Sequence, residues 1–142
     1  MYDVMDVLAN GLSAARLRIN VLASNIANAD TTKTPEGGPY KRRDVVQVAV
    51  PASGSFSSVL DKMSLYKPTI QAVIADQSAP RKVYQPGHPD ADQDGFVAYP
   101  NINVVATMTD LMTASRLYQA NVTALDAVRR MEQEALRISQ RF

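Results

Sequence analysis

The residues with the clearest capacity for chemistry are carboxylates at alternate positions in the stretch HPDADQDGFVAYP (88–100). If Asp90 takes the first position of a calcium-binding loop, Asp92 takes the third and Gly95 the sixth, as such loops require. The twelfth position should hold a bidentate glutamate, but in this chain it holds Asn101. The run therefore begins like a calcium loop and lacks its strongest ligand.

The residues beside Asp90 also disfavour a calcium site. A loop of this kind follows an incoming helix, which Pro86, Gly87 and Pro89 prevent. We therefore interpret the run as a proline-bounded turn whose aspartates are solvated or accept backbone N–H groups, with weak cation binding as the alternative. His88 is the only histidine, and we interpret it as a loop residue that makes a local hydrogen bond.

No other group of residues has the spacing of a catalytic or cofactor site. The chain has no cysteine, no G-x-S-x-G sequence and no phosphate-binding G-x-x-x-x-G-K-[ST] sequence. We predict that the protein is not an enzyme and that it uses neither a metal nor a cofactor.

Charge and hydropathy exclude further classes of partner. The chain carries fifteen basic and fourteen acidic residues, whereas nucleic-acid binding relies on clustered positive charge. No run approaches the roughly 18 apolar residues of a membrane span, so we expect no direct membrane insertion. Asp3 and Asp6 stand where a secretory signal carries basic residues, so we expect any export to proceed without a cleaved signal peptide.

Hydrophobic periodicity predicts one long amphipathic helix at each end of the chain, over about 3–28 and 103–139. Their apolar residues recur every three or four positions, which places them on one face. In the first helix this seam comprises Met5, Leu8, Leu12, Ala15, Ile19, Leu22, Ile26 and Ala29. In the second it comprises Val104, Met108, Leu111, Ser115, Tyr118, Val122 and Leu125.

The region between the helices contains all eight prolines. Short β-type runs at 43–50, 69–75, 81–84 and 95–99 predict strands, and the small polar residues of 51–59 predict a loop. The predicted organisation has an N-terminal helix within 1–30, an extended and β-containing insert at 31–100, and a C-terminal helix within 101–142. The fold class is mainly α, with the two long helices paired as a coiled coil.

Two helices and a small insert bury their apolar faces incompletely. One interpretation is that the insert supplies a third element that completes a helical hairpin. The other is that the helices find their remaining partners in other copies or other proteins. The periodicity establishes a buried face without identifying what buries it, so both interpretations stay open.

Two long stretches resemble the bacterial flagellar rod and hook axial proteins. LASNIANADTTKTPEGGPYKRRDVV (22–46) resembles the N-terminal signature of that family, and its second half is similar to the proximal-rod branch. VYQPGHPDADQDGFVAYPNINVVATMTDLMTASRLYQANVTAL (83–125) resembles the C-terminal half of the same branch. The resemblance covers nearly the whole chain and is weakest over about 51–70. Its motif residues are Asn25, Ile26, Ala27, Asn28, Thr34, Pro35, Gly37, Gly38, Tyr40, His88, Pro89, Asp90, Asp92 and Gly95.

The resemblance implies a structural subunit of the proximal rod of the flagellar basal body, stacked helically around an export channel and transmitting torque across the periplasm. Its implied partners are other rod proteins, copies of itself and the flagellar type III export apparatus, and the ring at the rod base is a further candidate. A small secreted calcium-binding module or a helical adaptor is the alternative function.

We expect assembly to depend on packed residues of the two long helices. These are Met5, Leu8, Leu12, Ile19, Leu22, Ile26, Met108, Leu111, Tyr118, Val122 and Leu125. Asn25 and Asn28 are candidates for fixing register, because a polar residue at a packed position favours the arrangement that satisfies it. For Asn28 the alternative is a helix-stop residue. By analogy with related axial proteins, residues 34–46 would form an extended arm that locks adjacent subunits, and the alternative is a surface loop.

Overall fold

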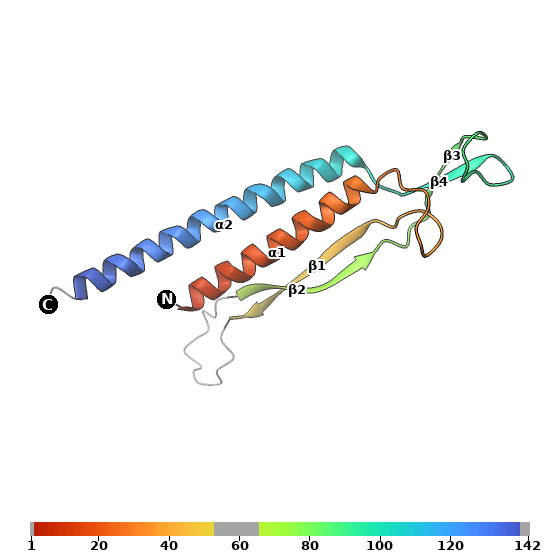
Figure 1. The fold of residues 1–142 in the computed structure, drawn as a ribbon. Helices are drawn as coiled ribbons and strands as arrows, with labels where there is room; N and C mark the ends of the chain where they lie inside the picture. The colour runs from red at the N-terminus through yellow and green to blue at the C-terminus, as the bar shows by residue number, and fades with distance from the viewer. Residues whose placement is uncertain (1, 53–65, 140–142) are drawn as a thin grey trace.

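The computed structural model describes residues 2–52 and 66–139. Two helices, α1 (Tyr2–Ala27) and α2 (Val104–Ser139), run antiparallel along each other and form an elongated body (Figure 1). Both helix predictions are confirmed to within about a residue at each end. Most of the predicted 51–59 loop lies outside the described residues.

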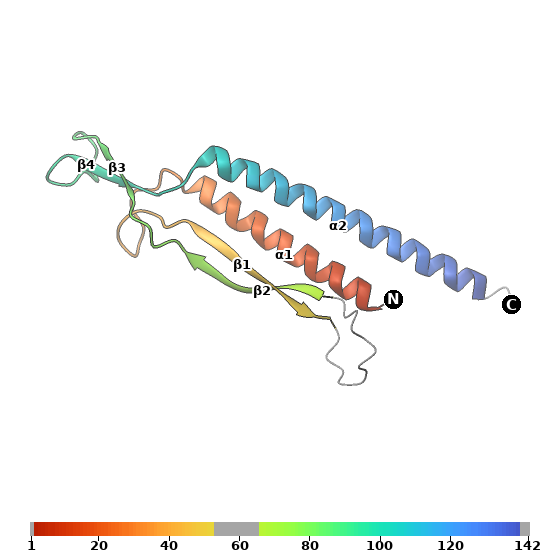
Figure 2. The ribbon, with the colours of Figure 1, turned by 180° about the vertical axis from the view of Figure 1, so that it is seen from behind.

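The two strands after α1 form an antiparallel hairpin, β1 (Arg43–Pro51) with β2 (Tyr66–Ala75). This hairpin packs on α1 on the side away from α2, so α1 is the middle of three layers (Figures 1 and 2). The insert therefore supplies the third element that one sequence interpretation required. Pro68 is accommodated because both strands of a two-stranded sheet are edges.

A second antiparallel hairpin, β3 (Arg81–Tyr84) with β4 (Phe96–Tyr99), projects beyond the end of the helical body (Figure 1). Among the described elements, β3 and β4 pack only on each other. All four strands lie where β-type runs bounded by proline and glycine predicted them. The start of α1 and the end of α2 both point toward the opposite end of the molecule.

Asn103 caps the start of α2. The backbone N–H of Ala106 donates to Oδ1 of Asn103 at 3.1 Å, which satisfies one free amide of the first turn. Nδ2 of Asn101, two residues earlier, donates to Oγ of Ser78 at 3.2 Å. Because no proline or glycine follows, α2 continues for 36 residues, against 26 for α1.

The hydrophobic core is small and consists mainly of alanine. The buried apolar residues among those described are Ala14, Ala15, Leu22, Ala29, Val97 and Ala114. The chain exposes 10547 Å². A compact monomer of 15.5 kDa exposes about 7,200 Å². The single copy therefore leaves a large surface uncovered.

Candidate assembly surfaces

The predicted seam of α1 lies in the layered interior. Leu22 is buried, as is Ala15 one heptad before it. The remaining predicted positions are half-buried: Met5, Leu8, Leu12, Ile19 and Ile26. Ala14 and Asn25 are also buried, because α1 is covered by α2 on one side and by the β1–β2 hairpin on the other. The heptad seam alone indicated only one covered side.

The contact face of α2 differs from the predicted seam at its N-terminal end. Leu111, Tyr118, Val122 and Leu125 are half-buried, as expected of residues beside α1. Met108 is 49% exposed, and Thr107 is buried in its place. The sequence prediction selected the larger apolar side chain, whereas a close helix pair favours the smaller one.

Small residues set the closest approach of the three layers. A Cβ on Gly11 would lie 3.2 Å from Nδ2 of Asn121 and 3.9 Å from Cγ of Pro68. An open groove of about 290 Å³ lies beside this point, with Ala14 and Ala114 in its wall. Neither Gly11 nor Asn121 was singled out from the sequence, because neither is part of an apolar stripe.

Asn25 joins α1 to the start of β1. Its Nδ2 donates to the backbone carbonyl of Arg43 at 2.8 Å, and its Oδ1 accepts from the backbone N–H of Arg43 at 2.9 Å. The hydroxyl of Tyr40 donates to the same Oδ1 at 3.1 Å, and Oγ of Ser24 lies 3.3 Å from that hydroxyl. Asn25 is 1% exposed. Because these hydrogen bonds form only when α1 and β1 lie in this register, the buried amide of Asn25 fixes that register.

Asn28 makes only local bonds at the end of α1. Its Nδ2 donates to the carbonyl of Ser24 at 2.9 Å, and its Oδ1 accepts from Oγ1 of Thr31 at 3.2 Å. These bonds satisfy groups of the last helical turn. The geometry matches the helix-stop alternative. The two neighbouring motif residues, Ile26 and Ala27, are half-buried and exposed respectively.

Residues 34–40 form a closed turn, which differs from the extended arm of the sequence prediction. The backbone N–H of Thr34 donates to the carbonyl of Gly38 at 2.9 Å, and that of Tyr40 donates to Thr31 at 3.0 Å. Gly37 and Gly38 hold φ angles of 87° and 74°, which favour glycine. The turn places exposed Pro35 at the surface and returns Tyr40 to Asn25.

The acidic run forms the loop between β3 and β4. Oδ1 of Asp92 accepts from the backbone N–H groups of Asp94 at 3.1 Å and Phe96 at 2.8 Å. Oδ2 of Asp90 accepts from Oγ1 of Thr32 at 2.8 Å. These aspartates therefore fix backbone amides and a neighbouring loop. In the part of the chain that the structure describes, no three acidic or histidine side chains converge as metal ligands would.

The remaining motif residues of this loop shape its two ends. Nδ1 of His88 accepts from the backbone N–H of Asp90 at 3.1 Å, the local bond that the sequence predicted, and Pro89 between them is exposed. Gly95 has φ of 81°, and a Cβ there would lie 2.9 Å from Cε2 of Tyr84. Glycine is therefore required both by the backbone and by the aromatic ring above it.

A charged cluster lies where the start of β1 meets the end of β2. Nη2 of Arg42 lies 2.9 Å from Oδ2 of Asp44, and its Nε lies 3.7 Å from Oδ2 of Asp76. The backbone N–H of Ser78, followed by its hydroxyl and by the charge of Arg42, lowers the pKa of Asp76 below its ordinary value of 3.8. Asp76 is therefore an ionised anchor at the end of β2.

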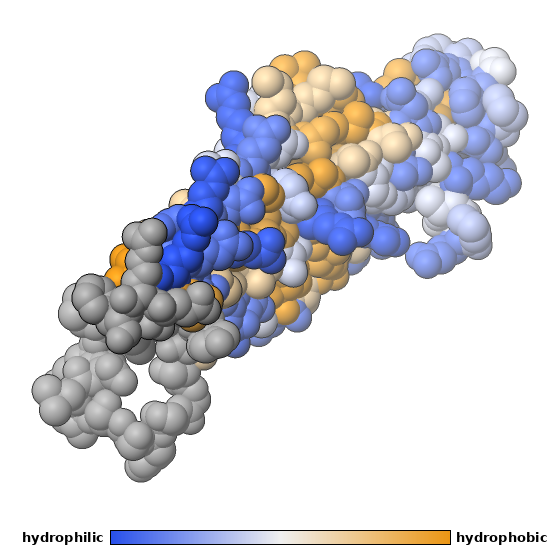
Figure 3. Space-filling model, turned by 60° about the vertical axis from the view of Figure 1, so that its left-hand side comes forward, coloured by the Kyte–Doolittle hydropathy of each residue, from blue (hydrophilic) through white to orange (hydrophobic). Residues whose placement is uncertain are grey.

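Much of the outer surface of α2 is apolar. Figure 3 shows hydrophobic side chains in a band along the body, bordered by hydrophilic ones. The most exposed large apolar residues of this helix are Val105, Met108, Met112, Leu117, Met131, Leu136 and Ile138. No helix in the described ranges is long and apolar enough to cross a membrane. Seven of the thirteen exposed large apolar residues of the described chain therefore lie on α2.

Both ends of the chain match models of flagellar rod families. Residues 5–33 match the family described as flagella basal body rod protein. Residues 93–138 match the family described as flagellar basal body rod FlgEFG protein C-terminal. The matched ranges contain most of α1 and α2.

Relatives match over nearly the whole chain. The flagellar basal-body rod protein FlgC of Salmonella typhimurium is 36% identical over 99% of this chain and 98% of its own length. The FlgC proteins of Borreliella burgdorferi and Bacillus subtilis are 37% and 35% identical, over 99% and 98% of this chain and 98% of each relative. Together with the paired terminal helices, these matches show that the chain belongs to the FlgC family of flagellar basal-body rod proteins.

Proposed function

We propose that the protein is a structural subunit of the flagellar basal-body rod and that it works by packing against other axial subunits. The observation that carries this proposal is the uncovered apolar surface of α2 in a chain whose relatives are rod proteins. A self-contained protein buries such a surface.

Three of the exposed large apolar residues of α2 belong to a second helical stripe, separate from the face on α1. Leu117, Met131 and Ile138 are 53%, 60% and 59% exposed. They belong to a series spaced by three or four residues, which places its members on one side of the helix. The series is Leu117, Ala120, Ala124, Ala127, Met131, Ala135 and Ile138. A stripe with this spacing is suited to a coiled coil with a helix from another subunit.

The area left uncovered has the size of an assembly interface. The excess over a compact monomer is about 3,300 Å², and obligate interfaces bury about 2,000–5,000 Å² summed over the two partners, or about 1,000–2,500 Å² on each. Part of this excess reflects the elongated shape of the molecule. The rest is surface that neighbouring subunits cover in the proposed assembly.

The end of α2 is the clearest unpartnered element. The helix is ten residues longer than α1, and Figure 1 shows its C-terminal end extending past the start of α1. Ten helical residues span about 15 Å. Met131 and Ile138 lie in this segment, so its apolar residues have no covering element within the described chain.

Within one subunit, the proposal assigns α1 and α2 to a coiled-coil pair and Asn25 to the register of β1 on α1. The seam residues of the first helix, Met5 through Ile26, support that pairing by their burial. The face of residues 34–46 that turns outward is the proposed contact with adjacent subunits, as a folded turn in place of an extended arm.

The proposed partners are other rod proteins and further copies of this chain. The flagellar type III export apparatus and the ring at the rod base are further proposed partners. The proposed location is the part of the rod that spans the periplasm, reached without a cleaved signal peptide.

The calcium-binding alternative has little geometric support. Oδ1 of Asp92 is already held by two backbone N–H groups. The helical-adaptor alternative would require a covered α2. No observation favours the calcium-binding module or the helical adaptor over the rod subunit.

The test is to locate the protein in basal bodies. An epitope inserted at residues 53–57, outside the described residues, marks the chain in a deletion strain whose motility it restores. Detergent-resistant basal bodies are then probed by blotting and by immunogold microscopy. Label on the rod is expected. A chain that restores motility but is absent from purified basal bodies would refute the structural role.

A further inference from the structure

We propose that the β3–β4 end of one copy docks into a basic pocket beside α1 on a second copy of the same chain. Here the finger means residues 84–96, and the basic pocket means the cavity lined by Thr31, Lys33, Pro35, Tyr40, Lys41 and Arg43. The inference deepens the proposed function and rests on it, because it names which surfaces meet between copies.

The basic pocket is open and positively charged. Its volume is about 380 Å³. Three basic side chains line it with a single carboxylate, that of Glu36, which leaves a net charge of +2. Within the described ranges, neither Lys33 nor Arg43 forms an ion pair. The guanidinium of Arg43 instead lies 5.9 Å from the ring centre of Tyr40. The pocket thus offers unneutralised charge beside an aromatic and proline wall.

The finger carries the complementary aromatic surface. Tyr84 and Phe96 are 63% and 39% exposed, and their ring centres lie 5.3 Å apart in an edge-to-face pair. Gly95 supports this pair, since any side chain there would meet the Tyr84 ring. Exposed, preorganised aromatic residues are the usual anchors of protein interfaces.

The finger also carries the complementary charge. Asp90, Asp92 and Asp94 lie in its loop, and Asp94 makes no ion pair with any described residue. The bonds from Asp92 to two backbone amides and from Thr32 to Asp90 hold the loop in one shape. The basic residues Arg81 and Lys82 lie in β3, outside the finger, and Arg81 stacks on Tyr99 at 5.6 Å.

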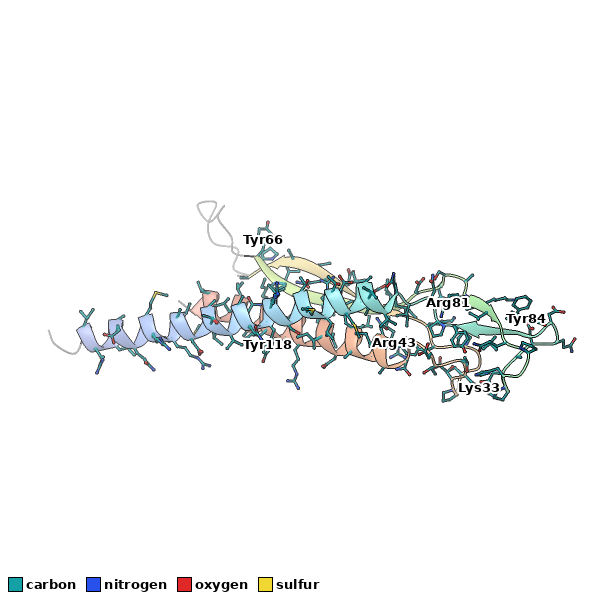
Figure 4. The ribbon with its side chains drawn as sticks, turned by 90° about the horizontal axis from the view of Figure 1, so that it is seen from above. Lys33, Arg43, Tyr66, Arg81, Tyr84 and Tyr118 are labelled. Atoms are coloured by element: carbon teal, nitrogen blue, oxygen red, sulfur yellow. The ribbon has the colours of Figure 1, made fainter. Side chains whose placement is uncertain are left out.

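The two surfaces lie on opposite sides of one molecule, so a copy cannot fill its own pocket. Thr31 and Lys33 line the pocket, whereas Thr32 between them bonds Asp90 of the finger. The side chain of Thr32 therefore faces the finger, whereas its neighbours Thr31 and Lys33 face the pocket. Figure 4 agrees, with Lys33 and Tyr84 at opposite edges of this end.

A contact between opposite sides at the same end joins copies head to tail. One patch meets a different patch on the next copy, which leaves a free finger and a free pocket for further copies. Because both surfaces lie at the β3–β4 end, the chain of contacts runs sideways from molecule to molecule and not along the helices. Such contacts fit subunits arranged around an axis.

Cross-linking in assembled basal bodies tests the contact, and the natural absence of cysteine makes it specific. The variant carries Lys33→Cys and Asp94→Cys. Two copies with different epitope tags are expressed together, basal bodies are purified, and a short bis-maleimide reagent is added. The reagent is needed because a disulfide requires Cα atoms within about 7 Å, closer than a lysine–aspartate pair holds them. The matched control pairs Lys33→Cys with Gln71→Cys on the exposed part of β2.

A ladder of dimers and larger species that contain both tags is expected from the first pair and not from the control. If the variant is present in basal bodies but stays monomeric, the docking proposal is wrong while the rod assignment stands. A cross-linked band that contains only one tag and a different protein would also overturn it, because the occupant would not be a second copy. Absence of wild-type chain from basal bodies would instead refute the proposed function.

If the cysteine variant does not assemble, exchanging the charges of Lys33 and Asp94 tests the same contact. Lys33→Glu and Asp94→Lys should each reduce motility and incorporation into basal bodies. The double variant restores one opposite-charge pair between copies and should recover both. A double variant that is as impaired as the worse single variant would refute the contact.

Discussion

The buried side chain of Asn25 fixes how α1 packs against β1. Its side-chain amide hydrogen-bonds both the backbone carbonyl and the backbone N–H of Arg43, as a neighbouring strand would do. A leucine at this buried position would leave those backbone groups unpaired. Ser24 and Tyr40 complete the arrangement, so a short polar segment holds α1 and β1 together.

Replacing Asn25 by alanine should therefore destabilise the protein. Two backbone groups lose a buried partner, and the expected loss is about 2–4 kcal/mol of unfolding free energy. Urea denaturation followed by circular dichroism measures it. Asn20→Ala, at an exposed position one turn and a half earlier, is the control and should change little. Equal stability of the two variants would show that the Asn25 bonds are not formed in solution.

Asp76 should make the stability depend on pH. Its pKa is lowered in the folded state, first by the Ser78 backbone N–H and then by the Ser78 hydroxyl and Arg42. The ionised form is thus favoured by folding. This contribution is present above the unfolded pKa and is lost as the pH falls through the folded pKa.

The variant Asp76→Asn tests this sign. The difference in unfolding free energy between the native chain and the variant should be largest at neutral pH. It should shrink steadily as the pH is lowered through and below 3.8. Urea denaturation at several pH values measures it, and Ser78→Ala should produce a smaller change because the backbone N–H remains. A difference that grows with acidification would reverse the assigned sign.

At the scale of elements, the sequence was sufficient to locate every helix and strand. Prolines and glycines bound the β-type runs, and an uninterrupted seam marks each helix, so local signals and tertiary structure agree. The contact residues were harder to predict. A stripe repeating every three or four residues leaves neighbouring positions such as Thr107 and Met108 nearly equivalent, and the close approach of α1 and α2 decides between them.

Hydrophobic periodicity could not predict the two hydrogen bonds between Asn25 and Arg43. Asn25 was identified as a residue that fixes register, but its partner is a backbone segment eighteen residues later and not a facing helix. The closed turn at 34–40 corresponds to the surface-loop alternative for this segment, and its two consecutive glycines take positive φ angles.

The exposed stripe of α2 predicts a substitution that blocks assembly without unfolding the subunit. Met131→Asp changes a residue that is 60% exposed in the single copy, so the unfolding free energy should change by less than about 0.5 kcal/mol. Incorporation into basal bodies and swimming should be lost, because a carboxylate would be buried between helices. Gln133→Asp, exposed on another side of the same turn, is the control. Normal motility of Met131→Asp would count against the stripe as an interface.

At the scale of the whole molecule, the layers predict an uneven stability. The middle of α1 is covered on two sides, whereas the end of α2 has no covering element among the described residues. In the isolated chain, amide hydrogen exchange should be slow over about 14–25 and fast over 131–138. Mass spectrometry of exchanged peptides measures this. Uniform protection from exchange along α2 would mean that the end of this helix needs no contact with another subunit to be stable.

The position of α1 between an early hairpin and a late helix has a consequence for the order of folding. The β1–β2 hairpin follows α1 directly, whereas Asn121 meets Gly11 only after 110 further residues have been made. Lengthening a closed loop from about 45 to 110 residues costs only about 0.8 kcal/mol, so the delay is kinetic in origin. We expect α1 and the hairpin to form a nucleus first and α2 to join it last. In a chain exported from its N-terminus, α2 would then stay unpaired until export ends. Its exposed apolar residues would become available only when neighbouring subunits are within reach.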